Sequence, residues 1–299
     1  MILALVRKLL RDLRIAWFVA ALLLFLFQIL WSRITMRVST QILDSLQQMN
    51  IPLEKLQNLV LGKNDVPAQM VQAMIGGEDI EINRASDMMS IAYVHPLVLT
   101  ILCLWAIGRA SIAIAGEIDR GTMELLLAQP IRRTQVVLAH LLVDAIVFPA
   151  LALALWMGTY CGTWWMGLQA ETNPMKHVDP WRFVQALPCI LALLFSVSGL
   201  TMWLSAMGRS RGRVGGLAIT LVLSMFLINV LGQIWEEQLG WLRPWTIFYH
   251  YRPQPIIQRG LWNQDSRVLL HLLTLAGVGV VGYLLAWTTF RRRDLPAPL

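Results

Sequence analysis

His140 and Asp144 are the ionisable pair best placed for chemistry inside an apolar segment. They are four residues apart, so a helix would put them on one face, where they could touch. Such a pair suits a proton relay or two ligands of a metal ion. A complete metal site needs a third and a fourth ligand, which the surrounding sequence does not supply. We therefore favour a structural pair that binds a neighbouring helix or loop.

Three further polar residues, Arg109, Asn229 and Gln233, fall within apolar runs. Arg109 lies about two turns before the end of its run, close enough to the membrane surface to extend its guanidinium into water. We interpret it as an interface charge, and the two amides as hydrogen-bonding residues in helix packing or pore lining. The alternative is a membrane-embedded enzyme that acts on a lipid or isoprenoid substrate through His140, Asp144 and Arg109.

A nucleotide-binding motif is missing from the sequence. The Gly62-Lys63 pair has Gln57 where a P-loop requires its first glycine, and Asn64 where it requires serine or threonine. The apolar runs also lack the rings of acidic residues expected of a cation channel. The cysteines have no spacing typical of a metal site or of a disulfide framework. We therefore expect a non-catalytic chain that binds no metal and no cofactor of its own.

The composition is that of an integral membrane protein. Of the 299 residues 57% are hydrophobic and only 14% are charged, and the mean hydropathy is +0.57. A soluble domain of this size is less apolar and more charged. The formal net charge is +7, but the basic residues cluster at the ends of apolar runs. That pattern sets membrane topology and argues against a nucleic-acid partner.

Helical periodicity predicts an all-α protein with six membrane spans. We place the spans at residues 15–34, 90–115, 136–160, 184–207, 214–234 and 268–290. The other predicted parts are an amphipathic elbow helix at 1–14, an external helical hairpin at 35–89, a cytoplasmic segment at 116–135 and an external loop at 235–267. Compact basic clusters on the short inner segments put both termini in the cytoplasm. The hairpin could also anchor an external partner, which is a further alternative for the function.

Small and polar residues in the later spans predict close helix packing. Ser198, Thr201 and Ser205 share one face of the fourth span. Gly282 and Ala286 have the spacing of two small residues on one face of the sixth span. Small residues let helix backbones approach each other, and hydroxyls bond across the contact.

The cytoplasmic segment has the punctuation of a short helix on the membrane surface. Gly121 is a flexible stop after the preceding helix, and Thr122 is a candidate N-cap. Glu124 lies in the first turn, where the helix dipole favours an anion. Leu125 begins a run of three leucines that supplies an apolar face, and Pro130 ends the helix.

This segment also carries a resemblance to a known family. It has the form E-x-x-x-G-T-x-E-x-L-L-x-x-P-x-x-R, and the residues that carry the resemblance are Glu117, Arg120, Gly121, Thr122, Glu124, Leu125, Leu126, Leu127, Pro130 and Arg133. Together with the six spans and the amphipathic N-terminal helix, the pattern resembles the permease subunits of ABC-2 type transporters. The resemblance is strongest to the bacterial branch that includes the NosY-like permeases.

The resemblance implies an exporter subunit of the bacterial inner membrane. Two permease subunits, identical or different, would pair, and each would dock on a separate subunit that binds ATP and Mg²⁺. In that family the segment after the second span is a coupling helix seated in a groove of the ATPase. The residues expected at this contact are Glu117, Arg120, Gly121, Thr122, Glu124, Leu125, Leu126, Pro130, Arg132 and Arg133. The alternative is a solvated loop whose charges only set topology.

Overall fold

The helices of the protein run side by side in one elongated bundle. The computed structural model describes residues 2–49, 84–173, 176–260 and 266–293, and no strand occurs in these ranges. Six stretches are long and apolar enough to cross a membrane, as predicted. They are formed by α1 (Ile2–Met49), α4 with α5 (Ala85–Val94 and Pro96–Ser111), α8 (Arg133–Trp165), α9 (Leu187–Met207), α10 (Arg211–Ile234) and α14 (Ser266–Arg292).

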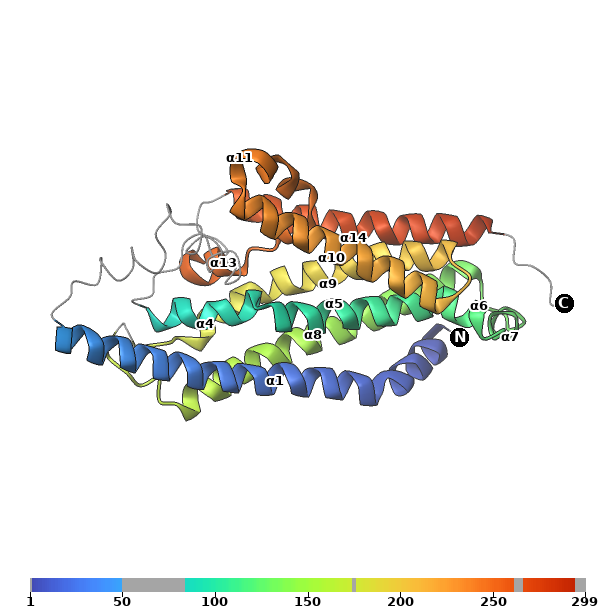
Figure 1. Cartoon of the computed structure of the whole chain (residues 1–299). Coiled ribbons are helices and arrows are strands. Elements are labelled where there is room, and N and C mark those ends of the chain that lie inside the picture. The colour runs from blue at the N-terminus through green and yellow to red at the C-terminus, as the bar shows by residue number, and fades with distance from the viewer. Residues whose placement is uncertain (1, 50–83, 174–175, 261–265, 294–299) are drawn as a thin grey trace.

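The first helix is longer than predicted. Residues 1–14 and 15–34 were expected to form an elbow helix and a span, but residues 2–49 form the single helix α1, which bends near its N-terminal end (Figure 1). Residues 35–49 therefore continue α1, and residues 85–89 begin α4. The rest of the predicted hairpin, 50–83, lies outside the described residues.

The second span contains two irregularities. Pro96 has no backbone N–H and disfavours helical geometry at the residue before it, so the chain breaks between α4 and α5. His95 sits at the break, where its ring nitrogen Nδ1 accepts a hydrogen bond of 3.2 Å from the amide of Leu97. At the other end, α5 runs into a π-helix, Ile112–Gly116, and then into the short helix α6 (Glu117–Asp119).

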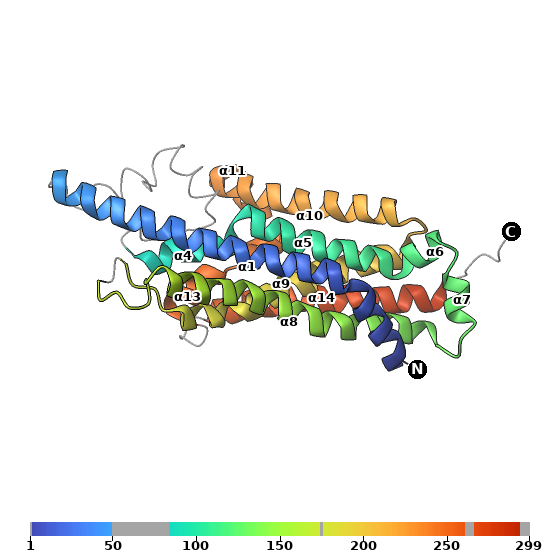
Figure 2. The same cartoon turned by 90° about the horizontal axis from the view of Figure 1, so that it is seen from below.

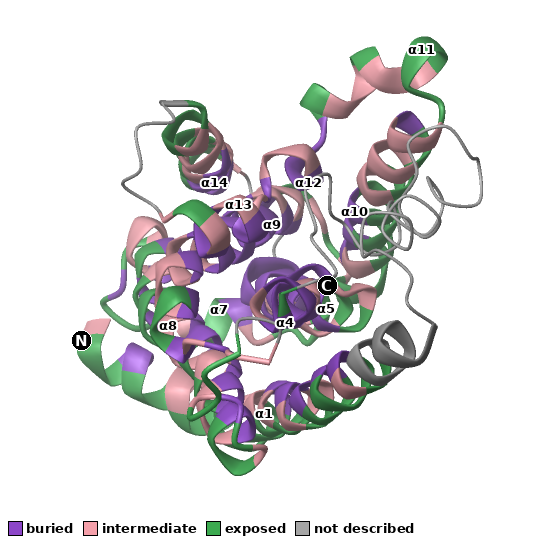
Figure 3. Cartoon of the chain, turned by 90° about the vertical axis from the view of Figure 1, so that its left-hand side faces the viewer, coloured by how far each residue is buried: buried purple, intermediate pink, exposed green. Residues whose placement is uncertain are grey.

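Three spans form the centre of the bundle and three form its periphery. The most apolar windows of Ala85–Asp119, Arg133–Trp165 and Pro180–Met207 are 61%, 56% and 61% buried. Those of α1, α10 and α14 are only 22%, 17% and 22% buried. Figure 3 shows α4 and α5 enclosed by the other helices. The exposed faces of the outer helices are apolar, as expected for contact with lipid or another membrane helix.

Short helices and aromatic residues gather at one end of the bundle. Between α10 and α14 lie α11 (Glu236–Leu239), α12 (Ile247–His250) and α13 (Pro253–Arg259). Three tryptophans are highly exposed at this end, and the first two belong to the last turn of α8: Trp164, Trp165 and Trp181. Exposed tryptophan is typical of the boundary between lipid and water.

Candidate functional site

The predicted cytoplasmic segment lies at the end of the bundle opposite α13. It contains α6 and α7 (Met123–Leu127), the turn between them, the loop 128–132 and the start of α8. Figures 1 and 2 both place α6 and α7 at the end where α1 begins and α14 ends. Helix α7 ends at Leu127, before Pro130. The segment is therefore a compact pair of short helices.

The carboxylate of Glu117 closes the turn between α6 and α7. It accepts hydrogen bonds from the guanidinium of Arg120 at 2.6 Å and from the hydroxyl of Thr122 at 2.5 Å. Gly121 has a φ of +68°, which glycine adopts without the steric penalty of a Cβ atom. Thr122 occupies the predicted N-cap position of α7, but its hydroxyl donates to Glu117 and forms no capping bond with an amide of α7. These bonds fix the angle at which α7 leaves α6.

Helix α7 has a buried side and an exposed side. Met123 is only 2% exposed and packs in an apolar cluster with the spans. Leu126 and Leu127 lie partly buried against the same cluster. Leu125 is 70% exposed, and Glu124 beside it is also exposed. The helix thus presents an apolar and an acidic side chain away from the bundle.

Hydrogen bonds join the segment to the ends of three other helices. The Asp119 carboxylate accepts from the backbone N–H of Arg211, the first residue of α10, at 3.3 Å. Arg133 donates to the carbonyl of Arg293, just after α14. Arg293 donates in turn to the carbonyls of Ala206 and Gly208 at the end of α9, each at 2.7 Å. A displacement of this segment would therefore be transmitted to several spans.

Arg293, which lies at the centre of these contacts, has a shifted pKa because it is partly buried. Burial lowers the pKa of the Arg293 guanidinium, and the nearby charge of Arg209 lowers this pKa further. An arginine stays protonated in proteins despite such shifts. Its positive charge therefore remains next to the carbonyl groups at the C-terminus of α9, where a helix dipole favours a cation.

The π-helix before α6 is stabilised by a side chain from α9. A π-helix displaces the regular pattern of backbone hydrogen bonds, and such bulges are frequent at functional sites. The Ser205 hydroxyl accepts from the amides of Ile114 and Ala115 at 3.2 and 3.0 Å. It also donates to the carbonyl of Ser111 at 3.3 Å. The sequence places Ser205 on a packing face, but it contains no signal for the π-helix.

Replacing Ser205 with alanine is expected to lower the free energy of unfolding by about 1–3 kcal/mol, the usual cost of unsatisfied buried polar groups. Thr201→Val is the control, because within the described residues this hydroxyl bonds only to the Val197 carbonyl of its own helix. Thermal unfolding of the purified protein measures both. A loss no larger for Ser205→Ala than for the control would contradict the role assigned to Ser205.

The position of Arg109 differs most from what the sequence predicted. Arg109 is not an interface charge: its side chain is 3% exposed and forms an ion pair with Asp144 on α8, which is 1% exposed. Its guanidinium also contacts ring nitrogen Nδ1 of His140 at 3.1 Å and donates to the His140 carbonyl. The predicted pairing of His140 and Asp144 with a neighbouring helix is thus correct in kind, and α5 is one of the helices they bind.

Two more residues complete this buried cluster. The Asp144 carboxylate accepts from the hydroxyl of Ser198 on α9 at 3.0 Å and from the hydroxyl of Tyr283 on α14. The two hydroxyls lie 2.9 Å apart. The five side chains connect four spans and satisfy one another, which suits a structural connection. Among the described residues no group of three or more His, Cys, Asp or Glu could hold a metal ion.

The predicted contact residues belong to the segment at this end of the bundle but differ in exposure. Five are exposed: Arg120, Gly121, Glu124, Leu125 and Pro130. Arg132 is exposed as well, and its amide donates to the side-chain carbonyl of Gln135 at 2.9 Å. The remainder are partly buried: Glu117, Thr122, Leu126 and Arg133. The exposed members could touch another protein, while the others shape the segment.

A known protein family matches nearly the whole chain. Residues 3–295 match the family described as ABC-2 family transporter protein. The match covers all six predicted spans and the segment between the second and third. A search of curated proteins finds no match.

Proposed function

The chain belongs to the ABC-2 family of transporter proteins, and from this premise we propose that it is one of two membrane subunits of an ATP-driven exporter. Membership supports a permease subunit that associates with an ABC ATP-binding subunit. We further propose a bacterial inner-membrane protein of the NosY-like branch, with α6 and α7 in the cytoplasm. It pairs with a second permease subunit, and each permease docks on a separate ATPase chain that holds ATP and Mg²⁺.

The exposed side of α7 is the observation that carries this proposal. Leu125 is 70% exposed next to the exposed Glu124, on a helix whose other side is anchored by the buried Met123. The sequence lacks a P-loop, so energy from ATP has to enter through another chain. A short helix of fixed orientation, with an apolar and a charged side chain facing outward, suits the groove of such a partner.

The contacts of the segment supply a mechanical path. Movement of the ATPase would displace α7, and the Glu117 turn passes the displacement to α6 and the second span. Asp119 connects it to α10, and Arg133 connects it to the carbonyl of Arg293 near the ends of α9 and α14. Closely packed helices shift as rigid bodies more readily than they deform. The spans would therefore tilt together.

The double substitution Glu124→Lys with Leu125→Ala is expected to weaken the ATPase contact at least roughly tenfold. Burying a leucine contributes about 1.5–3 kcal/mol, and 1.4 kcal/mol corresponds to a factor of ten in affinity. The charge reversal adds to the loss. Recovery of the ATPase with the purified permease measures assembly, and ATP hydrolysis stimulated by the permease measures coupling.

A matched control changes the same residue types at exposed positions of the opposite end. Glu171→Lys with Leu97→Ala alters a loop and the first turn of α5, far from α7. This variant should assemble and couple like the unmodified protein. Unchanged assembly and coupling in the Glu124 and Leu125 variant would refute the proposed contact.

The buried cluster does not favour the enzymatic alternative. Both Asp144 oxygens already accept hydrogen bonds, one from Arg109 and the other from Ser198 and Tyr283. His140 is 6% exposed and lies against Arg109. A general base has to reach the proton it abstracts, and these groups are engaged with one another. The geometry therefore supports a role in holding spans together.

A further inference from the structure

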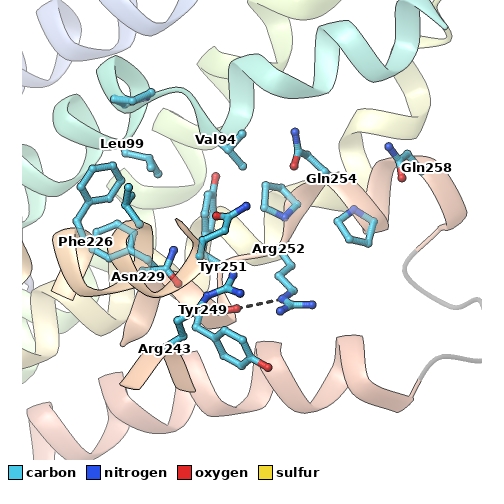
Figure 4. A pocket seen from close by; sticks show the side chains of 16 residues that line it. Val94, Leu99, Phe226, Asn229, Arg243, Tyr249, Tyr251, Arg252, Gln254 and Gln258 are labelled. Carbon is cyan, nitrogen blue, oxygen red and sulfur yellow. Dashed lines mark hydrogen bonds between the residues drawn. The ribbon is translucent and has the colours of Figure 1, made fainter. Parts of the chain in front are cut away.

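A polar pocket and an apolar groove adjoin each other at the end of the bundle opposite α7. The pocket lies between α5, α10, α12 and α13, and its polar lining includes Asn229, Gln233, Arg243, Tyr249, Arg252 and Gln254 (Figure 4). The groove follows α5 and α10 into the spans and is lined by apolar residues and one threonine, Thr100. Four residues line both cavities: Pro96, Leu99, Phe226 and Phe248. The two cavities therefore lie next to each other and share part of their walls.

The pocket is positively charged. The guanidinium groups of Arg243 and Arg252 lie 5.4 and 4.7 Å from the centre of the Tyr249 ring. Arg252 also donates to the Tyr249 carbonyl at 3.1 Å, a bond drawn in Figure 4. No aspartate or glutamate is among the described residues that line the pocket. Two cations held on one aromatic residue attract an anionic group, and the arginine fork matches phosphate geometry.

Buried amides offer further polar contacts to a ligand. Gln254 is 5% exposed, and its side-chain N–H₂ has no hydrogen-bond partner within the described part of the chain. The side-chain oxygen of Asn229 is also buried there without a partner. Leaving such groups unsatisfied is costly. The pocket thus has one donor for an anionic oxygen and one acceptor for a hydroxyl, in addition to its arginines.

The groove has the depth of one membrane leaflet. From Pro96 to Ile107, which both line the groove, α5 extends eleven residues, about 16 Å at 1.5 Å per residue. The hydrocarbon core of a bilayer is ~30 Å thick, so half of it has a similar length. The walls include the exposed apolar residues Leu104 and Leu223. An acyl chain would fit this surface without leaving the leaflet.

From these features we infer that the two cavities bind an anionic phospholipid of the adjacent leaflet. The phosphate contacts Arg243, Arg252 and the Gln254 amide, and an acyl chain lies in the groove between α5 and α10. Asn229 accepts a hydrogen bond from a hydroxyl of the headgroup. This site goes beyond the proposed ATPase contact, and it involves residues at the other end of the molecule.

Lipid retention by the purified full-length permease, without an ATPase, tests the inference. The protein in detergent is given phosphatidylglycerol, phosphatidylcholine or inorganic phosphate, and native mass spectrometry measures what stays bound. Phosphatidylglycerol should be retained about tenfold more than phosphatidylcholine, since charge-assisted hydrogen bonds account for at least 1.4 kcal/mol of binding. Inorganic phosphate should neither bind detectably nor displace the lipid, because it lacks the acyl chain.

Two variants separate the head and tail contacts. Arg243→Gln with Arg252→Gln should reduce phosphatidylglycerol retention about tenfold. Thr100→Trp fills the groove from an exposed position on α5, so it should reduce retention of the lipid without affecting folding. The controls at the same end are Arg182→Gln and Leu97→Trp, exposed residues outside both cavities, and they should retain lipid normally.

Three results would overturn the inference. They are equal retention of the anionic and the zwitterionic lipid, displacement by inorganic phosphate, and unchanged retention in both the arginine and the tryptophan variants. A negative outcome would leave the ATPase contact untouched, because no ATPase is present. Conversely, the variant Glu124→Lys with Leu125→Ala should retain lipid normally even if it no longer binds the ATPase.

Discussion

Asp144→Ala is expected to destabilise the protein by about 3–5 kcal/mol, because it leaves Arg109 as a buried charge without its counterion. The two side chains are 1% and 3% exposed. Breaking a buried pair is costly because the remaining charge can neither reach water nor find another partner. Arg109→Met should have an effect of the same order, since it leaves the carboxylate uncompensated.

The double variant Arg109→Met with Asp144→Asn separates charge imbalance from lost packing. It removes both charges, and the asparagine side-chain oxygen can still accept from the hydroxyls of Ser198 and Tyr283. Replacing a whole buried ion pair is often nearly neutral. The double variant should therefore be more stable than Asp144→Ala, and the two changes should not be additive.

Thermal unfolding in detergent, followed by tryptophan fluorescence, measures these differences. For a chain of this size, 3–5 kcal/mol corresponds to a fall in Tm of roughly 5–15 °C. The control is Arg182→Ala, which breaks the exposed pair between Arg182 and Asp179 at 3.9 Å. An exposed pair contributes only about 0–1 kcal/mol. A Tm change no larger for Asp144→Ala than for this control would show that the buried pair does not stabilise the bundle.

Arg109 also shows where sequence reasoning reached its limit. Its distance from the end of the apolar run is compatible with an extended side chain that reaches water, and also with a buried ion pair. The choice depends on which spans surround it, and α5 lies at the centre of the bundle. Helical spacing places His140 and Asp144 on one face, but it contains no information on a partner more than thirty residues earlier.

Other features could be predicted because their causes are local. Long apolar runs identified the six spans. Gly121 stops the helix before it through a positive φ, and α7 ends before Pro130. The π-helix could not be predicted, because it depends on the Ser205 hydroxyl from a span distant in the sequence. Thr122 is at the predicted N-cap position, but its hydroxyl binds Glu117 and does not cap α7.

The contact between α9 and α14 leads to the second large expected effect. A Cβ atom added at Gly282 would lie 2.4 Å from the carbonyl carbon of Gly199 and 2.8 Å from the amide nitrogen of Leu200. Both are backbone atoms, which cannot rotate away. Carbon atoms pack best at about 3.5–4.0 Å, so Gly282→Ala forces α14 away from α9 by roughly 1 Å. Forcing extra atoms into a close contact costs about 1–3 kcal/mol.

The position of Gly282 makes this displacement more damaging. Tyr283 is the next residue, and its hydroxyl binds Asp144 and Ser198 in the buried cluster. Ser196 of α9 donates to the Leu275 carbonyl of α14 at 2.6 Å, so the helices are bonded to each other as well as packed. Moving α14 strains both contacts. A larger side chain, as in Gly282→Val, should lower Tm further than Gly282→Ala.

Gly277→Ala is the matched control, because it makes the same change in the same helix. A Cβ atom there has no neighbour within 4 Å. Alanine is favoured over glycine inside a helix by about 1 kcal/mol, so this variant should be neutral or slightly more stable. The two substitutions are thus expected to shift Tm in opposite directions or to differ clearly in size. Equal shifts would mean that the backbones of α9 and α14 are not in direct contact, and the close packing predicted from Gly282 and Ala286 would then be wrong.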